Sequence, residues 1–443
     1  MGLEIFHFDG LSVVMSGLIG FIGLCVAAFS WRYLKGDHAY GRFFITLGLM
    51  VSALFVLVSA DHIALFIAAW AMANLMLVRL MVHKQSWRAA RESGRLTLKH
   101  FAFGFIAIAG GFALLYTQTG ETSIQALIST QYDPIILTGA LCLISIGATT
   151  QCGLWPFHRW LTSSLNSPTP TSAIMHAGLV NGGGFLIARF APLYVQLPDL
   201  LTVVFVIGLA TALIGTLWKL MQSDIKRMLA CSTMGQMGFM IAQCGLGLFP
   251  AAVAHLCWHG MFKAYLFLAS GGGAQEKRFD LCYPPSMKVF GLSLICGIAG
   301  AAAFSWAGNM TITAGDTTFF LIGMAFITES QLAMPILKKN AWRALPIAGI
   351  VTAAAGALYG FSIHAFEGLL MPMNLMQPQE LGALHIMGFA ALFVAWLSIL
   401  FGRNPERSAN MPRWMLRAYV TMLNASQPHP KTITAHRNHY HYQ

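Results

Sequence analysis

The chain has 443 residues, of which 56% are hydrophobic and only 10% are charged. A soluble globular domain carries about 25% charged residues, so this chain has too few charges to cover the surface of a water-soluble protein of its length. The net charge of +11 comes without a compact basic domain or arm, so no nucleic acid partner is expected, and the composition predicts a polytopic membrane protein.

Apolar segments long enough to cross a hydrocarbon core of about 30 Å recur along the chain. In chain order they are predicted near 11–31, 42–60, 62–83, 98–118, 135–154, 168–190, 199–220, 224–243, 250–271, 288–307, 317–337, 343–364 and 383–402. The predicted fold class is therefore an all-α membrane protein with about 13 transmembrane helices. Residues 1–402 form its transmembrane domain and 403–443 a cytoplasmic tail, in which 409–424 are compatible with an amphipathic helix at the membrane surface.

Lysine and arginine predict the orientation, because they are enriched in the cytoplasmic loops of membrane proteins. With the N-terminus outside, nearly all of the 27 Lys and Arg residues fall in inward connections or in the C-terminal tail. The exceptions are Arg189, which faces outward, and Arg79 and Lys263, which lie within spans. The predicted orientation is N-out and C-in, and the same asymmetry accounts for the net charge.

Ionisable side chains at membrane depth are costly, and for that reason they are usually functional. His255, His259 and Lys263 follow one another at i, i+4 and i+8, so on a helix they form one polar stripe about 12 Å long. Three titratable groups in a row are suited to stepwise proton transfer, with structural packing as the alternative. A zinc site would need a further ligand, and Lys263 would repel the cation, so no metal site is predicted.

Two more titratable residues lie well inside predicted spans, His176 and Glu329. Glu329 is the only deep acid, and its alternative interpretation is a helix–helix hydrogen bond made by a protonated carboxyl group. The predicted ion path runs through His176, His255, His259, Lys263 and Glu329, with Asp224 and Lys226 at its inner edge.

Prolines interrupt one long apolar stretch, between Trp155-Pro156-Phe157-His158 and Pro168-Thr169-Pro170. Prolines free backbone carbonyls, and irregular backbone at membrane depth belongs in the protein interior or beside a water-filled cavity. We therefore predict a broken helix marked by Pro156, Pro168 and Pro170, with a simple re-entrant connection as the alternative. Glycines 182–184, which follow, allow close helix approach.

Three stretches of the chain resemble the antiporter-like subunits of respiratory complex I, the subunit L / chain 5 family, which also occurs in cation antiporters and membrane hydrogenases. They begin at Phe8-Asp9-Gly10-Leu11-Ser12, at Trp155-Pro156-Phe157-His158 and at Ser223-Asp224-Ile225-Lys226-Arg227. Together they cover roughly residues 6–275, in order and at the family's spacing. The resemblance implies two inverted five-helix repeats, each with a broken helix, at about 42–190 and 199–337 here.

The chain departs from this family at the residues that carry its ion pumping. Ala71 stands where the family has a glutamate, and the lysine of the first broken helix falls on Gln151. The second broken helix falls near 297–307, with Ala307 at its lysine. Two N-terminal helices and a long C-terminal lateral helix of the family also have no counterpart here, which weakens an assignment to complex I.

The short form and the run from His176-Ala177-Gly178-Leu179 to Arg189 resemble the membrane subunit of the DAB inorganic carbon transporters. That resemblance implies a bacterial inner-membrane subunit that conducts H⁺ or Na⁺ and energises CO2/bicarbonate uptake. The implied partner is a large cytoplasmic-side subunit like a zinc carbonic anhydrase, so no cofactor and no enzyme activity are expected in this chain. The alternatives are a proton-pumping subunit of an NADH dehydrogenase or hydrogenase-type complex, and a non-conducting membrane anchor.

Overall fold

A computed structural model describes residues 5–272, 284–338, 340–402 and 412–433. Within these ranges the chain is built from α-helices and short 3₁₀ turns, and strand pairing is limited to isolated bridges such as that between Phe6 and Ala60. The predicted all-α fold class is confirmed.

Each of the thirteen predicted spans corresponds to a helix or to a pair of short helices. They are α1 (Gly10–Tyr33), α2 (Tyr40–Ser59), α3 (Ile63–Met81), α4 (Arg88–Thr119), α6 (Pro134–Gln151), α8 (Thr169–Ala177) with η1 (Leu179–Asn181) and α9 (Gly182–Arg189), α11 (Pro198–Met221), α12 (Ile225–Gly245), α13 (Phe249–Leu268), α14 (Met287–Ala307), α15 (Thr318–Leu337), α16 (Ala341–Leu370) and α17 (Ala383–Phe401). In the described ranges, ten helices are individually long and apolar enough to cross a membrane. The α8–α9 pair, α12 and α13 are not among these ten, and they carry most of the predicted ion-path residues.

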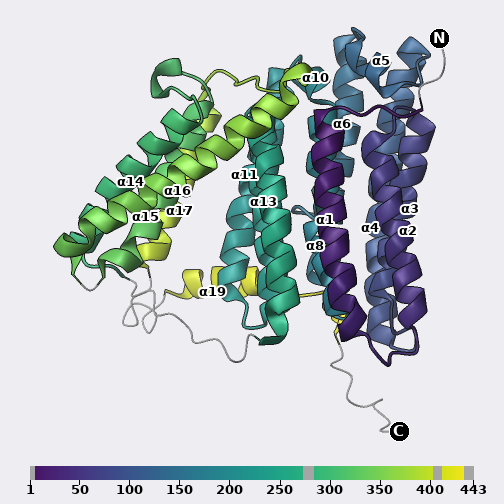
Figure 1. The fold of residues 1–443 in the computed structure, drawn as a ribbon, viewed down its shortest axis with the longest axis horizontal. Coiled ribbons are helices and arrows are strands. Elements are labelled where there is room, and N and C mark those ends of the chain that lie inside the picture. The colour runs from purple at the N-terminus through teal and green to yellow at the C-terminus, as the bar shows by residue number, and fades with distance from the viewer. Residues whose placement is uncertain (1–4, 273–283, 339, 403–411, 434–443) are drawn as a thin grey trace.

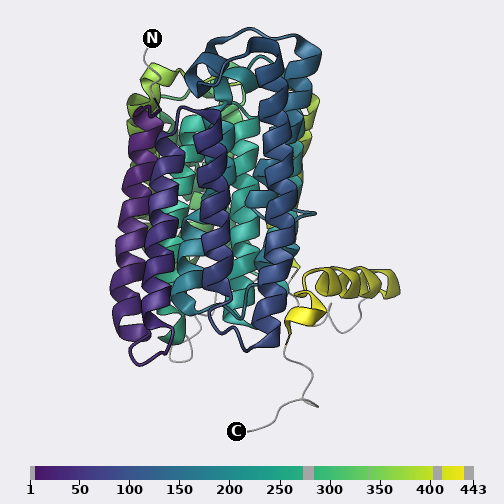
Figure 2. The same cartoon turned by 90° about the vertical axis from the view of Figure 1, so that its right-hand side faces the viewer.

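The remaining elements are short and lie in connections or in the tail. They are α5 (Ile124–Ser129), α7 (Arg159–Thr162), α10 (Ala191–Tyr194), α19 (Arg413–Ala425), η2 (Ala269–Gly272), η3 (Ile312–Ala314), η4 (Met371–Met373) and η5 (Pro430–Thr432). Helix α19 overlaps the stretch 409–424, for which the sequence allows an amphipathic helix, and it runs across the direction of the bundle helices (Figure 2).

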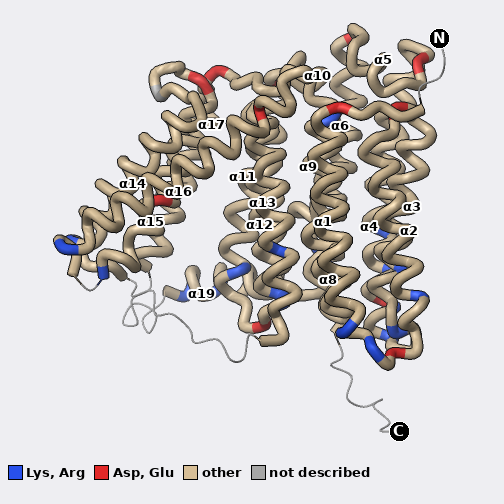
Figure 3. The backbone as a smooth tube through the Cα atoms, in the orientation of Figure 1, with Lys and Arg blue, Asp and Glu red and all other residues tan. Residues whose placement is uncertain are grey.

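The spans run side by side, with the start of α1 and the η5 segment at opposite ends of the bundle (Figure 1). Lysine and arginine gather at the end that carries α19, whereas Asp and Glu are frequent at the other (Figure 3). This is the distribution that the positive-inside rule needs for the predicted orientation, which itself stays a prediction. Two predicted inward segments, the loop 273–283 with Lys277 and Arg278 and the tail residues 403–411, lie outside the described residues.

Helices α14–α17 pack mainly on one another, and they meet the rest of the bundle near the end where α1 begins. There a buried cluster joins Phe205 and Leu246 to Phe304 and Ile363. In the same region the hydroxyl of Thr317 donates to the Leu246 carbonyl at 2.6 Å. Toward the α19 end the two groups of helices diverge (Figure 1). The buried contacts named here between the two groups therefore lie near the end where α1 begins.

The first half of the molecule contains the predicted broken helix. Helix α6 ends at Gln151, a connection follows, and the short α7 begins only at Arg159. Pro168 caps the next helix and Pro170 lies in its first turn, where the missing N–H of proline costs no hydrogen bond. In the second half, by contrast, α14 continues unbroken through residues 297–307, where the resemblance implied the second broken helix.

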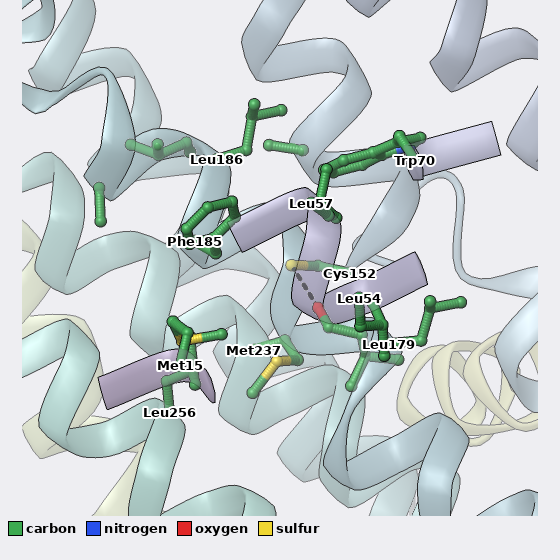
Figure 4. Close-up of a cluster of buried hydrophobic side chains, with 14 of the residues drawn as sticks. Met15, Leu54, Leu57, Trp70, Cys152, Leu179, Phe185, Leu186, Met237 and Leu256 are labelled. Carbon is green, nitrogen blue, oxygen red and sulfur yellow. Dashed lines mark hydrogen bonds between the residues drawn. The ribbon is translucent and has the colours of Figure 1, made fainter. Parts of the chain in front are cut away.

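Close packing of α9 against α6 depends on glycine. A Cβ at Gly183 would overlap with the Ala148 carbonyl oxygen and would lie 2.5 Å from the Cys152 sulfur. Figure 4 shows Cys152 within a dense apolar cluster that includes Trp70 and Phe185. Its thiol donates to the Val180 carbonyl at 3.1 Å. These contacts explain why small residues stand at 182–184.

Gly183→Ala is expected to destabilise the chain by about 1–3 kcal/mol, the usual cost of adding a methyl group to a filled core. Gly48→Ala is the matched control, because a Cβ there meets no atom within 4 Å. Alanine in an open helical position should be neutral or stabilising by about 0.5–1 kcal/mol. Thermal unfolding of the detergent-solubilised variants measures both changes. Equal melting temperatures for the two variants would contradict the packing account.

Candidate ion path

His255, His259 and Lys263, the predicted polar stripe, lie in one row along α13. The rings of His255 and His259 are nearly parallel, with their centroids 6.0 Å apart. Lys263 follows one turn later and is only 1% exposed. Pro250 starts the helix in its first turn, and residues four apart then share one face. The spacing in the sequence thus places all three groups on one line along the helix.

Lys263 lies inside the bundle with very little to balance its charge. Its ammonium donates one long hydrogen bond, 3.4 Å, to the carbonyl of Leu229 on α12. No carboxylate of the described residues forms an ion pair with it. A charged lysine at the centre of a membrane costs at least about 2.5–3.5 kcal/mol, so this group needs water beside it or must release its proton. Both conditions suit a residue that handles protons.

His176 and Lys226 extend the row toward the α19 end. His176, near the end of α8, is buried and stacks on Phe267 of α13 with ring centroids 4.4 Å apart. It lies within electrostatic range of both Lys263 and Lys226. The Lys226 ammonium donates to the Ser167 carbonyl at 3.2 Å. The structure therefore brings His176 together with the α13 row and places Lys226 beside the start of α8.

Asp224 has a structural role at the same end of the bundle, as the N-cap of α12. Its carboxylate accepts from the backbone N–H of Arg227 at 2.9 Å and caps the start of α12. The cap fixes where α12 begins, and with it the position of Lys226 two residues later.

Several buried polar atoms along this row have no hydrogen-bond partner within the protein. They are His176 Nδ1, Asn181 Oδ1, Gln243 Oε1 and Nε2, His255 Nε2 and His259 Nε2. Buried polar groups are costly unless they are satisfied, and ordered water is the usual partner where protein supplies none. We therefore expect ordered water beside these atoms on adjoining helices.

On the side of α3 and α6 the structure adds two amide residues that the sequence analysis missed, Asn74 and Asn181. Asn74 of α3 and Gln151 of α6 exchange hydrogen bonds of 3.2 and 3.0 Å, and Gln151 also donates to the Leu179 carbonyl at 3.3 Å. Asn181 follows directly, and its amide lies beside Gly260 on α13. Gln151, predicted at the broken helix, thus connects α3 to the α13 row.

On the side of the row that faces helices α14–α17, a polar contact crosses between the two groups of helices. Gln243 of α12 lies beside Tyr359 of α16, and the ring of Phe239 lies 5.5 Å from that of His255. A single neutral amide inside an apolar span leaves no pattern in the sequence, which is why Asn74, Asn181 and Gln243 were not predicted.

Pro156 and Glu329 stand apart from this row. Pro156 lies on the surface and lines an apolar cavity of about 510 Å³ between α6 and α11. Glu329 of α15 is 6% exposed and packs against Gly300 of α14, without contact to the α13 row. The structure does not bring this predicted path residue together with the others.

A buried ion pair closes the end of the bundle opposite to α19. Arg189, at the end of α9, donates to both carboxylate oxygens of Asp9, and to the hydroxyl of Ser12 at 2.9 Å and the carbonyl of Val58 at 3.1 Å. Burial raises the pKa of Asp9, but the Arg189 guanidinium and the hydrogen bonds from Ser12 outweigh it and hold the pKa below its ordinary value. The one predicted outward arginine is thus fixed by an acid 180 residues earlier in the chain.

No group of three or more His, Cys, Asp or Glu side chains that could hold a metal ion occurs among the described residues. The seven cysteines in those ranges are free thiols. The tail histidines His436, His439 and His441 are potential metal ligands by residue type, and they lie outside the described residues.

Two family models match the chain. The model for the transmembrane region of NADH:quinone oxidoreductase and Mrp antiporters matches residues 59–284. The model for the N-terminus of chain 5 of complex I matches residues 5–44. The matched ranges include the broken helix, α12 and the whole α13 row.

Individual relatives match beyond these ranges. The chain is 35% identical over 442 residues to the probable inorganic carbon transporter subunit DabB of Bacillus anthracis, across 96% of this chain and 85% of that protein. It is 39% identical to subunit DabB1 of Halothiobacillus neapolitanus, across 61% of this chain and 50% of that protein, so it spans half the length of that relative. With NADH-quinone oxidoreductase subunit L of Pseudomonas aeruginosa it shares 32% identity, across 82% of this chain and 58% of that protein.

The structure also resembles a solved one. The Mrp complex from Dietzia sp. DQ12-45-1b contains a chain that matches 97% of this one with a TM-score of 0.58 and 22% identity, which covers 49% of that chain. At this identity the likeness to the solved chain is one of fold alone. The family model and the relatives confirm the predicted resemblance to antiporter-like subunits. This multi-pass membrane protein belongs to the NADH:quinone oxidoreductase/Mrp antiporter family, among relatives that include the DabB subunits of inorganic carbon transporters.

Proposed function

We propose that this chain is the ion-conducting membrane subunit of an inorganic carbon transporter. The observation that carries this proposal is the match to DabB of Bacillus anthracis, which takes in 96% of this chain and 85% of that protein. The match to subunit L of Pseudomonas aeruginosa takes in only 58% of that protein. A relative matched over nearly its whole length is the better guide to what the whole chain does.

The polar row supplies the physical basis for conduction. A cation cannot cross apolar protein, whereas His255, His259 and Lys263 offer titratable groups at steps of about 6 Å along α13. Water at the unpartnered nitrogens would bridge these steps. In this proposal a proton passes along the row, and Lys263 alternates between its charged and neutral forms. His176 and Lys226 continue the route to the end that carries α19.

The partner is proposed to sit at that same end, which in the predicted orientation lies on the cytoplasmic side of a bacterial inner membrane. Described tail residues are already held there by the loops: Ser426 accepts from Gln222 at 2.8 Å, and the Thr432 carbonyl accepts from Asn166 at 2.7 Å. The proposed partner is a zinc-containing, carbonic-anhydrase-like subunit. Zinc and hydration chemistry then belong to the partner, and this chain contributes ion flow without enzyme activity of its own.

A proton-pumping subunit of a redox complex is the second candidate, favoured by the 32% identity to subunit L of Pseudomonas aeruginosa. Three departures count against it, because Ala71, Gln151 and Ala307 replace the glutamate and the two lysines expected of such a pump.

Purification of the intact complex from native membranes, through an affinity tag on this chain, distinguishes the candidates. We expect a large subunit that carries zinc, measured by metal analysis, and carbon uptake that collapses when an uncoupler removes the ion gradient. Copurified flavin or iron–sulfur subunits would instead identify the redox complex. A zinc-containing partner whose uptake is indifferent to the gradient would leave this chain as a non-conducting anchor.

A further inference from the structure

The interior of the α14–α17 unit holds a second titratable site. Glu329 of α15 is 6% exposed, and its Oε2 has no hydrogen-bond partner. It faces α14 at Gly300, where a Cβ would lie 2.5 Å from the Glu329 Cγ, and the carbonyl of Thr352 on α16 adjoins the same glycine. The carboxyl group is therefore enclosed where three helices meet.

No opposite charge accompanies this carboxyl group. No charged side chain interacts with it from α14, α15, α16 or α17. The neighbouring helices present Gly297, Gly300 and Thr352, and the nearby titratable side chain they add is the thiol of Cys296, whose carbonyl accepts from the Thr352 hydroxyl at 3.1 Å. An ionised carboxylate without a partner in such surroundings costs several kcal/mol at least. Neutralisation by a bound cation removes that cost.

The packing decides which cation fits. A metal ion that sheds its water needs a shell of oxygen ligands, and here the Thr352 carbonyl is the one backbone oxygen that lies beside Gly300 together with Glu329. The hydroxyl of Ser330, the next residue, lies against Gly297, and it has no hydrogen-bond partner among the described residues. The methylenes of Glu329 fill the notch that Gly300 leaves open, so little space is left for water. A proton needs no ligand shell and fits without rearrangement.

We propose that Glu329 is a second proton-binding site, separate from the α13 row, which holds its proton as a neutral carboxylic acid between α14, α15 and α16. Binding converts carboxylate and H⁺ into the acid, whose O–H can donate to the Thr352 carbonyl. Thr352 and Tyr359 lie seven residues apart on one face of α16, about 10 Å along the helix, and Tyr359 adjoins Gln243 at the end of the polar row. One face of α16 therefore runs from the Glu329 site toward the end of the polar row.

This inference rests on the proposed function for its part in transport and names H⁺ as the ion, but its test needs neither the partner nor carbon uptake. Dicyclohexylcarbodiimide attaches covalently to protonated carboxyl groups in apolar surroundings. The full chain, in phosphatidylcholine vesicles, is treated with this reagent and its peptides are analysed by mass spectrometry. We expect several-fold more label on Glu329 than on the exposed Glu380, with a loss of label as pH rises and no change when Na⁺ replaces K⁺.

Infrared spectroscopy supplies an independent readout. The carbonyl band of a protonated carboxylic acid should disappear in Glu329→Gln and persist in the control Glu380→Gln. Protection from the label by Na⁺ at constant pH would show a sodium site and overturn the proposal. Absence of both the label and a Glu329-dependent acid band would mean that the carboxylate is ionised, which also overturns it. Neither result would bear on the zinc content of the purified complex, so the two proposals fail separately.

Discussion

Lys263→Met should reduce ion flux through the chain by about 10²-fold or more, the range expected when a positioned proton-transfer group is lost. Methionine keeps the length of the side chain and removes its titratable group. Because the ammonium is 1% exposed with a single weak hydrogen bond, its removal should leave the free energy of unfolding unchanged or raise it. Proton uptake into vesicles, followed with a pH-sensitive dye, measures the flux.

Two further variants sharpen this prediction. Lys263→Arg should also fail, since a guanidinium group stays protonated under all relevant conditions. Lys99→Met is the matched control, because Lys99 is exposed on α4, and we expect it to conduct like the wild type. Partner binding should survive in all three variants. Normal flux in both Lys263 variants would show that the lysine is structural and would favour the non-conducting anchor.

Arg189→Met should lower the free energy of unfolding by about 3–5 kcal/mol, the typical cost of removing one partner from a buried ion pair. The loss is large because Asp9, 10% exposed, would keep its charge without a counterion. Asp9→Asn together with Arg189→Met removes both charges and should recover part of that stability. Unfolding of the solubilised variants in denaturant measures the three values. A double variant no more stable than Arg189→Met would argue against this account.

The contribution of the Asp9–Arg189 pair to the free energy of unfolding should be lost at low pH. The pKa of Asp9 in the folded chain lies below its ordinary value of 3.8, so the unfolded chain binds this proton at the higher pH. The stabilising contribution is therefore complete above pH 3.8 and is lost as pH falls toward the lowered pKa. Wild-type stability should show no change assignable to this pair between about pH 5 and 8.

Hydropathy predicted the spans well, because the cost of placing polar backbone and side chains in hydrocarbon leaves a strong signal over about 19 residues. The prediction of 317–337 agrees with α15 at Thr318–Leu337. The prediction of 98–118 missed the first ten residues of α4, which begins at Arg88. That part of α4 carries Arg88, Arg91, Glu92 and Arg95 and continues the helix beyond its apolar segment, where a hydropathy window has no signal.

Within the candidate site, the sequence predicts the relative positions of residues only where they belong to one helix. The α13 row follows from the helical period, since His255, His259 and Lys263 lie one turn apart. The link between Asn74 and Gln151 joins residues 77 positions apart, and the separation of Glu329 from the row follows from how two groups of helices meet. Such relations depend on tertiary packing, which a single sequence does not reveal.

The contact between Asp9 and Arg189 also constrains how the chain is made. Proteins are synthesised from the N-terminus, so α1 enters the bilayer while its final partner, 180 residues later, is still to be translated. The hydroxyl of Ser12 can already donate to the Val58 carbonyl at 2.7 Å once α2 has followed, which gives α1 a provisional neighbour. α1 also packs against α8 and α13, which arrive later still. α1 is therefore made before the helices that hold it, and Asp9 gains its counterion only after Arg189 has been translated.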